Sequence, residues 1–253
     1  MFEQVSQHIF IRKYQHYTDR PNIGLIRGQR RALLFDAGNS EAHTLLLKQE
    51  LEEAGLPMPD CVALSHWHWD HSFGTAFWGA EVIAGRETDT QLRKMARWQW
   101  DDDAMQRRID AGEEIAFCSD MIKREYPDRS KIRVVGADIV FDGRLTLDLG
   151  GVTCELIHAR GPHSSDSVIC YVPEDRFVLL GDSNCKDLYG LSWECDIEVE
   201  GSFTAATDAL EYDPEKVRDY LQLLDGLDFT HCISGHSEVK TRAHQLASLK
   251  EVL

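Results

Sequence analysis

Four potential metal-binding side chains occur within one run of six positions: His66, Trp67, His68, Trp69, Asp70 and His71. This segment directly follows residues 61–65, CVALS, which have the composition of a short buried strand. In an extended turn, His66 and His68 point the same way because side chains alternate with a period of two. Asp70 has the same parity but lies farther along the chain, and His71 begins a new element. Since imidazole and carboxylate groups bind metal ions in proteins, we expect this loop to serve two neighbouring ions, one through two histidines and one through Asp70 and His71.

The apolar pattern of the remaining chain predicts two strand-rich parts separated by a helical segment. Strands are predicted at 7–14, 22–28, 30–36 and 61–65, and then at 132–135, 138–143, 144–150, 152–159, 167–172, 176–182 and 229–234. Helices are predicted at 40–55, 213–226 and 237–253, and residues 86–130 fit short amphipathic helices better than strands. This order predicts an α/β fold in which two sheets pack face to face with helices outside.

The charge balance and the cysteines limit the classes of protein to which the chain can belong. With 43 acidic residues against 27 basic ones, the net charge is −16, whereas a general nucleic-acid binder needs a basic surface. The 7 cysteines are scattered without a CxxC pair, which is typical of reduced thiols in a cytosolic protein. The first residues lack the pattern of a signal peptide, and the apolar runs are too short to span a bilayer. We therefore expect a cytoplasmic protein without a nucleic-acid or membrane partner.

The six-residue run has the form HxHxDH, and the sequence resembles the metallo-β-lactamase-fold hydrolases, for which this motif is the signature. Other markers of that family follow in the expected order, each after an apolar stretch. They are Asp36 in LLFDAG, His163 in RGPHSSDS, Asp182 in VLLGDS and His236 in ISGHSE. The resemblance implies a four-layer αββα sandwich, with residues 1–253 forming a single domain that carries a helical insertion at about 86–130.

The same resemblance implies which side chains hold metal. One ion is bound by His66, His68 and His163, the other by Asp70, His71 and His236, and Asp182 bridges the two. Asp36 is implied to brace the metal loop from outside. Related di-iron oxygen reductases usually carry an acidic residue where this chain has His68, which favours two zinc ions, with iron and manganese as alternatives. Water activated by the ions is the implied nucleophile, and Asp70 and Asp182 are the expected catalytic residues.

Aromatic residues near these markers are candidates for substrate contact. They are Trp67 and Trp69 in the metal loop, Tyr189 in the segment after Asp182, and Trp98, Trp100 and Trp193. Many acyl-homoserine lactonases have a tyrosine three residues after the bridging aspartate, whereas this chain has Cys185 there, which we interpret as a packing residue rather than a ligand. From Asp187 to Glu215 there are nine acidic residues and no basic one. Such a segment is usually a solvated face, and at the rim of a site it also disfavours polyanionic substrates.

The function that these features favour is a binuclear zinc hydrolase, with a small-molecule ester, thioester, lactone or amide as its substrate. Three alternatives stay open. The first is a mononuclear iron oxidoreductase of the persulfide dioxygenase type on the same fold, and the second is a phosphodiesterase. The third is a non-enzymatic metal-binding protein, although the complete ligand set argues against a decayed site. A homodimer is left open as the state of assembly.

Overall fold

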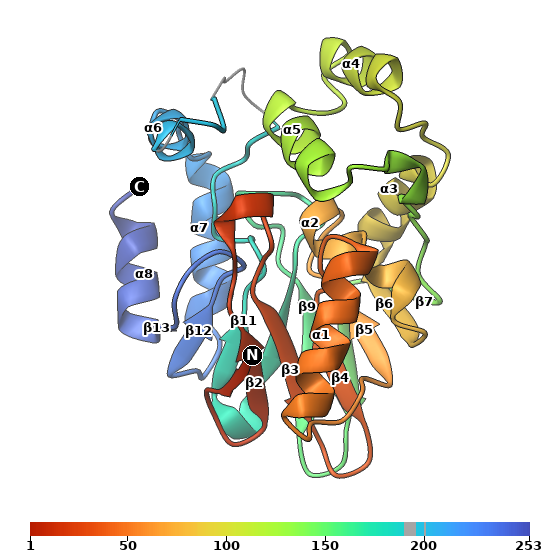
Figure 1. Ribbon diagram of the computed structural model, residues 1–253. Helices are drawn as coiled ribbons and strands as arrows, with labels where there is room; N and C mark the ends of the chain where they lie inside the picture. The colour runs from red at the N-terminus through yellow and green to blue at the C-terminus, as the bar shows by residue number, and fades with distance from the viewer. Residues whose placement is uncertain (190–195, 200) are drawn as a thin grey trace.

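The computed structural model describes residues 1–189, 196–199 and 201–253 and contains two β-sheets stacked face to face (Figure 1). The N-terminal sheet runs in chain order through β1 (Phe2–Gln4), β2 (Ile9–Arg12), β3 (Ile23–Arg27), β4 (Ala32–Phe35), β5 (Cys61–Ala63), β6 (Glu81–Gly85) and β7 (Ile139–Phe141). The C-terminal sheet has the order β13 (Lys240–Thr241), β12 (His231–Ile233), β11 (Phe177–Leu179), β10 (Val168–Val172), β9 (Thr153–His158) and β8 (Arg144–Asp148).

Helices lie on the outer faces of both sheets and at one end of the sandwich (Figure 1). They are α1 (Glu41–Glu53), α2 (Trp69–Ser72), α3 (Arg86–Met95), α4 (Asp102–Asp110), α5 (Ala116–Glu125), α6 (Ser202–Asp208), α7 (Pro214–Asp225) and α8 (Arg242–Lys250), with 3-10 turns η1 (His16–Thr18), η2 (Thr75–Phe77), η3 (Arg129–Lys131) and η4 (Pro173–Asp175). Leu47 of α1 and Leu92 of α3 pack on the N-terminal sheet, whereas Val217 of α7 and Leu246 of α8 pack on the C-terminal sheet. In the described part of the chain, no helix has both the length and the apolar character needed to cross a membrane.

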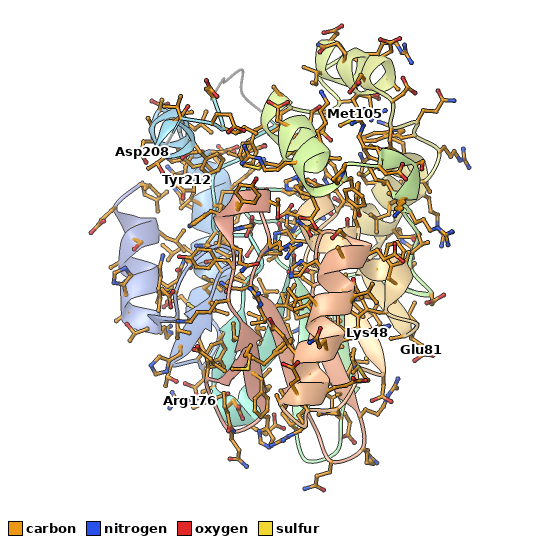
Figure 2. The ribbon with its side chains drawn as sticks, viewed as in Figure 1. Lys48, Glu81, Met105, Arg176, Asp208 and Tyr212 are labelled. Carbon is orange, nitrogen blue, oxygen red and sulfur yellow. The ribbon has the colours of Figure 1, made fainter. Side chains whose placement is uncertain are left out.

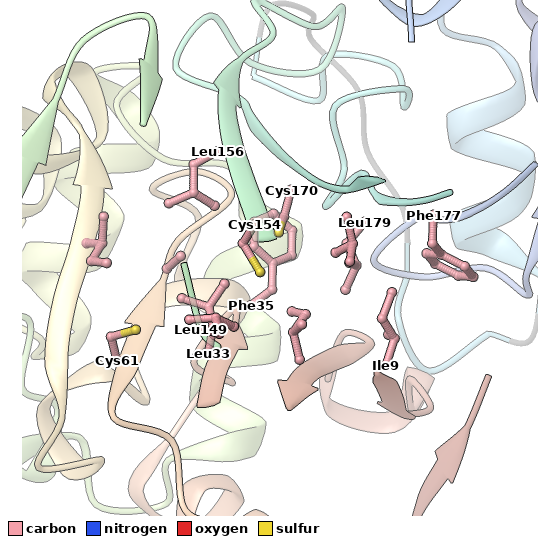
Figure 3. Close-up of a cluster of buried hydrophobic side chains, with 14 of the residues drawn as sticks. Ile9, Leu33, Phe35, Cys61, Leu149, Cys154, Leu156, Cys170, Phe177 and Leu179 are labelled. Carbon is pink, nitrogen blue, oxygen red and sulfur yellow. The ribbon is translucent and has the colours of Figure 1, made fainter. Parts of the chain in front are cut away.

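Strand β4 shows why the sequence of the central strands is apolar throughout. Leu33 and Phe35 face the core between the sheets, while Leu34 between them faces the helices outside. A strand that is buried on both faces needs an uninterrupted apolar run. The same inner core receives Leu156 and Leu179 from the C-terminal sheet (Figure 3). The predicted α/β fold, with two sheets inside and helices outside, is confirmed.

The direction of the strands brings several loops to one edge of the sandwich. Strand β4 pairs with β5 in parallel, so the residues that follow them, Asp36 and the segment 66–71, leave the sheet on the same side. Strand β11 pairs with β12 in parallel, and the segments that follow carry Asp182 and His236. The turn from β9 to β10 carries His163 and reaches the same edge, because both β9 and β11 run antiparallel to β10.

Helices α3, α4 and α5 form the insertion that the sequence predicts at 86–130, and it lies over one end of the sandwich (Figure 1). Figure 2 shows Met105 of this insertion at one end of the molecule and Arg176, in the turn before β11, at the other. Met105 and other apolar side chains of the insertion form a cluster with Trp69 of α2 and with Phe73, which follows α2. The insertion is therefore packed directly on the segment that carries the HxHxDH motif.

Some element predictions are wrong. Residues 132–135 form no strand; Ile132 and Val134 instead pack against the insertion cluster, so the apolar alternation marks an extended segment without ladder partners. The helix predicted from 237 begins only at Arg242, where Thr241 caps it, because the preceding residues form β13. Strands β1 and β6 and helix α6 were not predicted from the sequence.

Candidate metal centre

Seven side chains that the sequence singles out converge at the edge of the sheets beneath the insertion. They form two groups, the first with His66, His68 and His163 and the second with Asp70, His71, Asp182 and His236. Within each group the potential ligand atoms lie within 4.8 Å of one another. All are buried except His236, which is partly exposed. The structure thus brings together every residue that the sequence suggests as a metal ligand.

Asp182 lies between the two groups. Its Oδ2 atom is 3.5 Å from Nε2 of His71 and 3.6 Å from Nε2 of His236, both of its own group. The same oxygen is 3.9 Å from Nε2 of His163, which belongs to the other group. One carboxylate therefore reaches both groups, as a bridging ligand must.

Glycines allow the loops to approach this closely. A Cβ atom on Gly235 would lie 2.2 Å from Oδ1 of Asp182 and 2.7 Å from Cε1 of His71, so no side chain fits there. The backbone N–H of Gly235 donates to the carbonyl of Gly181 at 2.8 Å, which ties the two loops together. Gly181 has a φ of 52°, and a Cβ atom on it would meet the side chain of Ser65. Steric crowding therefore explains why a glycine precedes both Asp182 and His236.

The donor set fits a bound cation. Among the described residues, Nε2 of His66 and Oδ1 of Asp182 are buried and have no hydrogen-bond partner, whereas Nε2 of His71 lies 2.9 Å from a carboxylate oxygen of Asp70. Buried polar atoms are nearly always hydrogen-bonded, because an unpaired one costs about 1–3 kcal/mol. Metal binding accounts for both unpaired atoms, and imidazole with carboxylate suits zinc, iron or manganese. The residues present therefore fit a centre for divalent metal ions.

Two imidazoles of the first group are neutral at physiological pH. Burial holds the pKa of His66 well below its usual value, and the neighbouring imidazole of His68 lowers it further. Burial and the adjacent His163 lower the pKa of His68 in the same way. Neutral imidazole is the form that binds metal, so these two side chains lose no proton when a cation arrives.

The second group holds opposite charges instead. Burial alone would lower the pKa of His71, but the carboxylates of Asp70 and Asp36 raise it well above its usual value. Burial likewise opposes protonation of His236, but the charge of Asp182 and the hydrogen bond that His236 donates to Asp70 raise its pKa to about 9. Burial would raise the pKa of Asp70 and of Asp182, but the two imidazolium charges lower it. In the metal-free protein, imidazolium therefore compensates the buried carboxylates at neutral pH.

Asp36 braces His71 from outside the two groups. Its Oδ2 atom accepts a hydrogen bond from Nδ1 of His71 at 2.8 Å, and its Oδ1 atom accepts one from the backbone N–H of Ser65 at 2.7 Å. Asp36 has a φ of 68°, in the left-handed region that non-glycine residues rarely adopt. An outer partner of this kind fixes the tautomer of a metal-binding imidazole and leaves Nε2 free for the metal.

Two other imidazoles have outer partners as well. Nδ1 of His66 lies 2.9 Å from the hydroxyl of Ser65. Nδ1 of His163 lies 2.7 Å from the carbonyl of Lys186, in the segment that follows Asp182. As with His71, the ring nitrogen that faces away from the cluster is the one that the protein holds, so Nε2 is left to bind metal.

Asp166 was not singled out from the sequence, although it lies close after His163. Its buried carboxylate accepts hydrogen bonds from the backbone N–H of Trp67 at 3.0 Å and from the hydroxyl of Thr88 at 2.8 Å. The hydroxyl of Ser164 donates to its other oxygen. Asp166 thereby ties the metal loop to α3 and to the loop that carries His163. Its place within RGPHSSDS is the one signal that the sequence offers for it.

For Asp19 the sequence holds no signal. This residue follows η1, with a φ of 54°, and its Oδ1 atom lies 3.8 Å from Nδ1 of His236. Burial and the charge of Asp70 raise the pKa of Asp19 to about 7. Asp19 and His236 are far apart in the sequence, so only the fold places this carboxyl group beside the second group.

The aromatic candidates for substrate contact have different surroundings. Trp67 is partly buried, with its ring 5.0 Å from that of Tyr189. Trp69 is only 1% exposed and packs on Phe73 within the insertion cluster, so the structure does not support it as a substrate contact. The rings of Trp98 and Trp100 lie 4.5 Å and 4.8 Å from the guanidinium group of Arg108, and both residues belong to the insertion's own packing. Trp193 lies outside the described residues.

Some acidic residues of the segment after Asp182 pair with basic residues from elsewhere in the chain. Arg124 of α5 forms an ion pair with Glu198, and Nζ of Lys216 lies 4.0 Å from Asp187. Glu194 and Glu200 lie outside the described residues. The pairing of Glu198 with α5 places part of this segment beside the insertion.

Comparison with known proteins identifies the family and the fold of the chain. The family model described as metallo-beta-lactamase superfamily matches residues 17–229. A solved metallo-beta-lactamase from Pontibacter korlensis is 16% identical, with a TM-score of 0.63 over 99% of this chain and 98% of that one. A metallo-beta-lactamase family protein from Thermus thermophilus is 18% identical, with a TM-score of 0.63 over 96% of this chain and 78% of that one. A search of curated proteins finds no match.

At these identities the solved structures show a shared fold and nothing finer. A metallo-beta-lactamase from Cronobacter sakazakii, described by its HARLDQ motif, is 17% identical, with a TM-score of 0.64 over 99% of this chain and 91% of that one. This chain has the motif HWHWDH at residues 66–71. Likeness of fold therefore extends to proteins whose motif differs in composition, and the chemistry of this chain must be argued from its own residues.

Replacing Asp36 with alanine is expected to weaken zinc binding about 10- to 100-fold, because His71 loses the partner that orients it. Competition with a chromophoric chelator measures the affinity. The matched control is Asp175→Ala, which breaks another aspartate–histidine contact, with His8, in the turn at the opposite end of the sheets. Equal zinc affinity in Asp36→Ala and the wild type would show that Asp36 does not brace the site.

Zinc binding at pH 7 is expected to release about two protons per chain, because the imidazolium groups of His71 and His236 must lose a proton to bind metal. The raised pKa values of both histidines set the sign, so the apparent affinity rises with pH through neutrality, and the contribution of His236 ends above its pKa of about 9. Calorimetry in buffers of different ionisation enthalpy counts the protons. The His236→Gln variant should release about one proton fewer; a release that is independent of this change would contradict the assignment.

Proposed function

Because the chain belongs to the metallo-β-lactamase superfamily, we propose that it is a binuclear zinc hydrolase that cleaves a small ester, thioester, lactone or amide. The observation that carries this proposal is the pair of donor groups that Asp182 joins. A purely structural zinc site is closed by four protein ligands, whereas a catalytic site keeps a position open for water or substrate. The first group offers three imidazoles and shares its fourth donor, Asp182, with the second group, an arrangement that a closed structural site does not need.

When bound, two divalent cations supply a hydroxide nucleophile near neutral pH and polarise the carbonyl group that is attacked. The chain's own residues have the remaining tasks. Oδ2 of Asp70 lies 2.9 Å from Nε2 of His71 and 3.1 Å from Nε2 of His236. Its lowered pKa keeps Asp70 ionised, so it can accept a hydrogen bond and orient the attacking water. Asp182 holds the two groups at a fixed separation.

Charge favours a small and weakly charged substrate. The chain carries a net charge of −16, and the acidic segment that follows Asp182 contributes to the rim near α5. Charges at a surface act over a Debye length, which is about 8 Å at physiological salt. A polyanion such as a nucleic acid would be repelled over that distance, whereas a neutral ester or lactone would not.

The alternative oxidoreductase is less well supported. A mononuclear iron dioxygenase needs one set of ligands, and the first group alone would suffice for it. The second group, with two carboxylates and two imidazoles at short distances, would then have no role. A phosphodiesterase would use both ions, so the choice between it and a carboxylic ester hydrolase rests on the charge of the rim.

The variant Asp182→Ala is expected to lower hydrolysis by about a hundredfold or more and to reduce zinc content from about two ions per chain, since the Asp182 carboxylate reaches both groups. Elemental analysis and initial rates measure the two effects. The matched control is Cys185→Ser, which should keep its metal, because burial and the charge of Asp182 raise the pKa of the thiol and leave it protonated. If the serine variant lost metal and the alanine variant kept it, the assignment of ligands would be wrong.

A substrate panel tests the class of reaction. For the zinc-loaded protein, kcat/KM is expected to be higher for small carboxylic esters, thioesters or lactones than for phosphodiesters, and a chelator should abolish it. Oxygen uptake is measured in the same preparations with a persulfide substrate. Efficient cleavage of RNA or DNA would refute the proposed substrate class, and a single iron per chain with oxygen uptake would refute the hydrolase itself.

A further inference from the structure

His68 differs from the other imidazoles of the first group in how it is held. Nδ1 of His66 and Nδ1 of His163 each meet an oxygen atom outside the cluster. Nδ1 of His68 instead lies 3.0 Å from Nε2 of His163, which is itself a proposed ligand. Among the described residues no other hydrogen bond is found for the His68 ring. Apart from this contact with another proposed ligand, its orientation therefore comes from packing.

Aromatic rings supply that packing. The ring of Tyr189 lies 4.8 Å from that of His68, at an interplanar angle of 33°, so the two rings are closer to stacked than to perpendicular. Trp67 meets His68 edge-on at 4.5 Å. The ring of His163 lies 4.7 Å away but is itself a proposed ligand, and Trp67 belongs to the same metal loop as His68. Among the described residues, Tyr189 is therefore the ring contact that comes from outside the loop and the proposed ligands.

The hydroxyl group of Tyr189 does not face the metal groups. It donates a hydrogen bond to Oε1 of Glu114 at 2.7 Å and lies 3.4 Å from Sγ of Cys118. Both partners belong to the helical insertion, in and just before α5. The hydroxyl group of Tyr189 therefore bonds to the insertion, and only its ring contacts the metal groups.

Burying the carboxyl group of Glu114 costs free energy. It is 3% exposed, and its Oε1 atom also accepts from the backbone N–H of Ile115 at 2.9 Å. Its Oε2 atom is buried and has no hydrogen-bond partner among the described residues. Burial raises the pKa of Glu114 to about 7, a sign of how poorly the site tolerates its charge. An apolar side chain would pack there at less cost, so the hydrogen bond with Tyr189 is what the carboxyl group contributes.

The segment that carries Tyr189 touches both groups of proposed ligands. It begins with Asp182 in the second group, and its Lys186 carbonyl faces Nδ1 of His163 in the first. Tyr189 then covers the ring of His68. A single short stretch of chain thus contacts the donors of both ions, and Glu114 fixes its far end.

We propose that Tyr189, held in place by Glu114 of the helical insertion, is the positioning residue of His68 and sets the geometry of the first metal group. This inference rests on the proposed role of His68 as a metal ligand. It assigns Tyr189 no proton transfer and no contact with the reacting atoms. It also makes the insertion, through one hydrogen bond, a part of the metal centre.

Cobalt(II) loaded in place of zinc reports on this geometry, because its visible absorption depends on the arrangement of its ligands. The test compares wild type, Tyr189→Phe, Glu114→Ala and Glu114→Gln. We expect the first two variants to shift the absorption bands and to weaken binding of the more loosely held cobalt ion by about tenfold. Glu114→Gln should resemble the wild type, because its amide oxygen still accepts the hydrogen bond from Tyr189. The matched control is Tyr171→Phe, which loses a hydrogen bond to the Asp228 carbonyl on the C-terminal sheet.

Two further measurements separate positioning from a general structural role. The double variant Glu114→Ala/Tyr189→Phe should be no worse than the more affected single variant, since both break the same hydrogen bond. With an active substrate, the variants should lower kcat more than they raise KM, whereas a mere wall of the substrate cleft would raise KM. Additive losses, or a change confined to KM, would overturn the inference.

Metal binding by the wild type distinguishes failure of this inference from failure of the proposed function. If the wild type binds neither cobalt nor zinc, the proposed function fails. If it binds both, and Tyr189→Phe has the spectrum and affinity of the wild type, only the positioning role fails. Should Glu114→Ala not fold, as judged by its thermal unfolding, Tyr189→Phe and Glu114→Gln still decide the question.

Discussion

The burial of carboxylates and imidazoles in one small region is the constraint on which the rest of this structure depends. Asp70 and Asp182 carry negative charge where an unpaired carboxylate is costly, and imidazolium at His71 and His236 compensates it in the metal-free state. Bound metal ions would replace those protons, and the same side chains would then be their ligands. The fold must therefore hold the donors at short and fixed separations in both states, which a flexible loop cluster could not do.

The sandwich meets this requirement by keeping the donors next to its strands. Asp36 directly follows β4, and His66, Asp182 and His236 each lie three residues after the last residue of β5, β11 and β12. So short a distance from a hydrogen-bonded strand leaves the backbone little freedom. Gly181 and Gly235 then remove the side chains that would keep the loops apart. The rigidity of the two sheets is thus passed directly to the donors.

That closeness also explains how much could be predicted from the sequence. Each donor follows an apolar run, so the pattern of strands and the ligand motif could be found together, as in CVALS followed by HWHWDH. Local sequence patterns gave wrong predictions where contacts between distant segments determine the structure. Residues 132–135 alternate as a strand would but find no ladder partner, and Trp69 is drawn into the insertion cluster rather than facing a substrate. The positions of Asp19 and Glu114 depend wholly on segments that meet only in the folded chain.

The insertion is tied to the metal loop by apolar packing as well as by polar contacts. Trp69 lies between the proposed ligands His68 and Asp70, and its side chain belongs to the same buried cluster as Met105 and Phe117. A movement of α4 or α5 away from the sheets would therefore expose Trp69, at a cost on the order of 2 kcal/mol or more for one large side chain. The insertion consequently acts on the site as a fixed frame rather than as a freely moving cover. Any change in its packing reaches the ligands through α2, which begins within the HxHxDH motif itself.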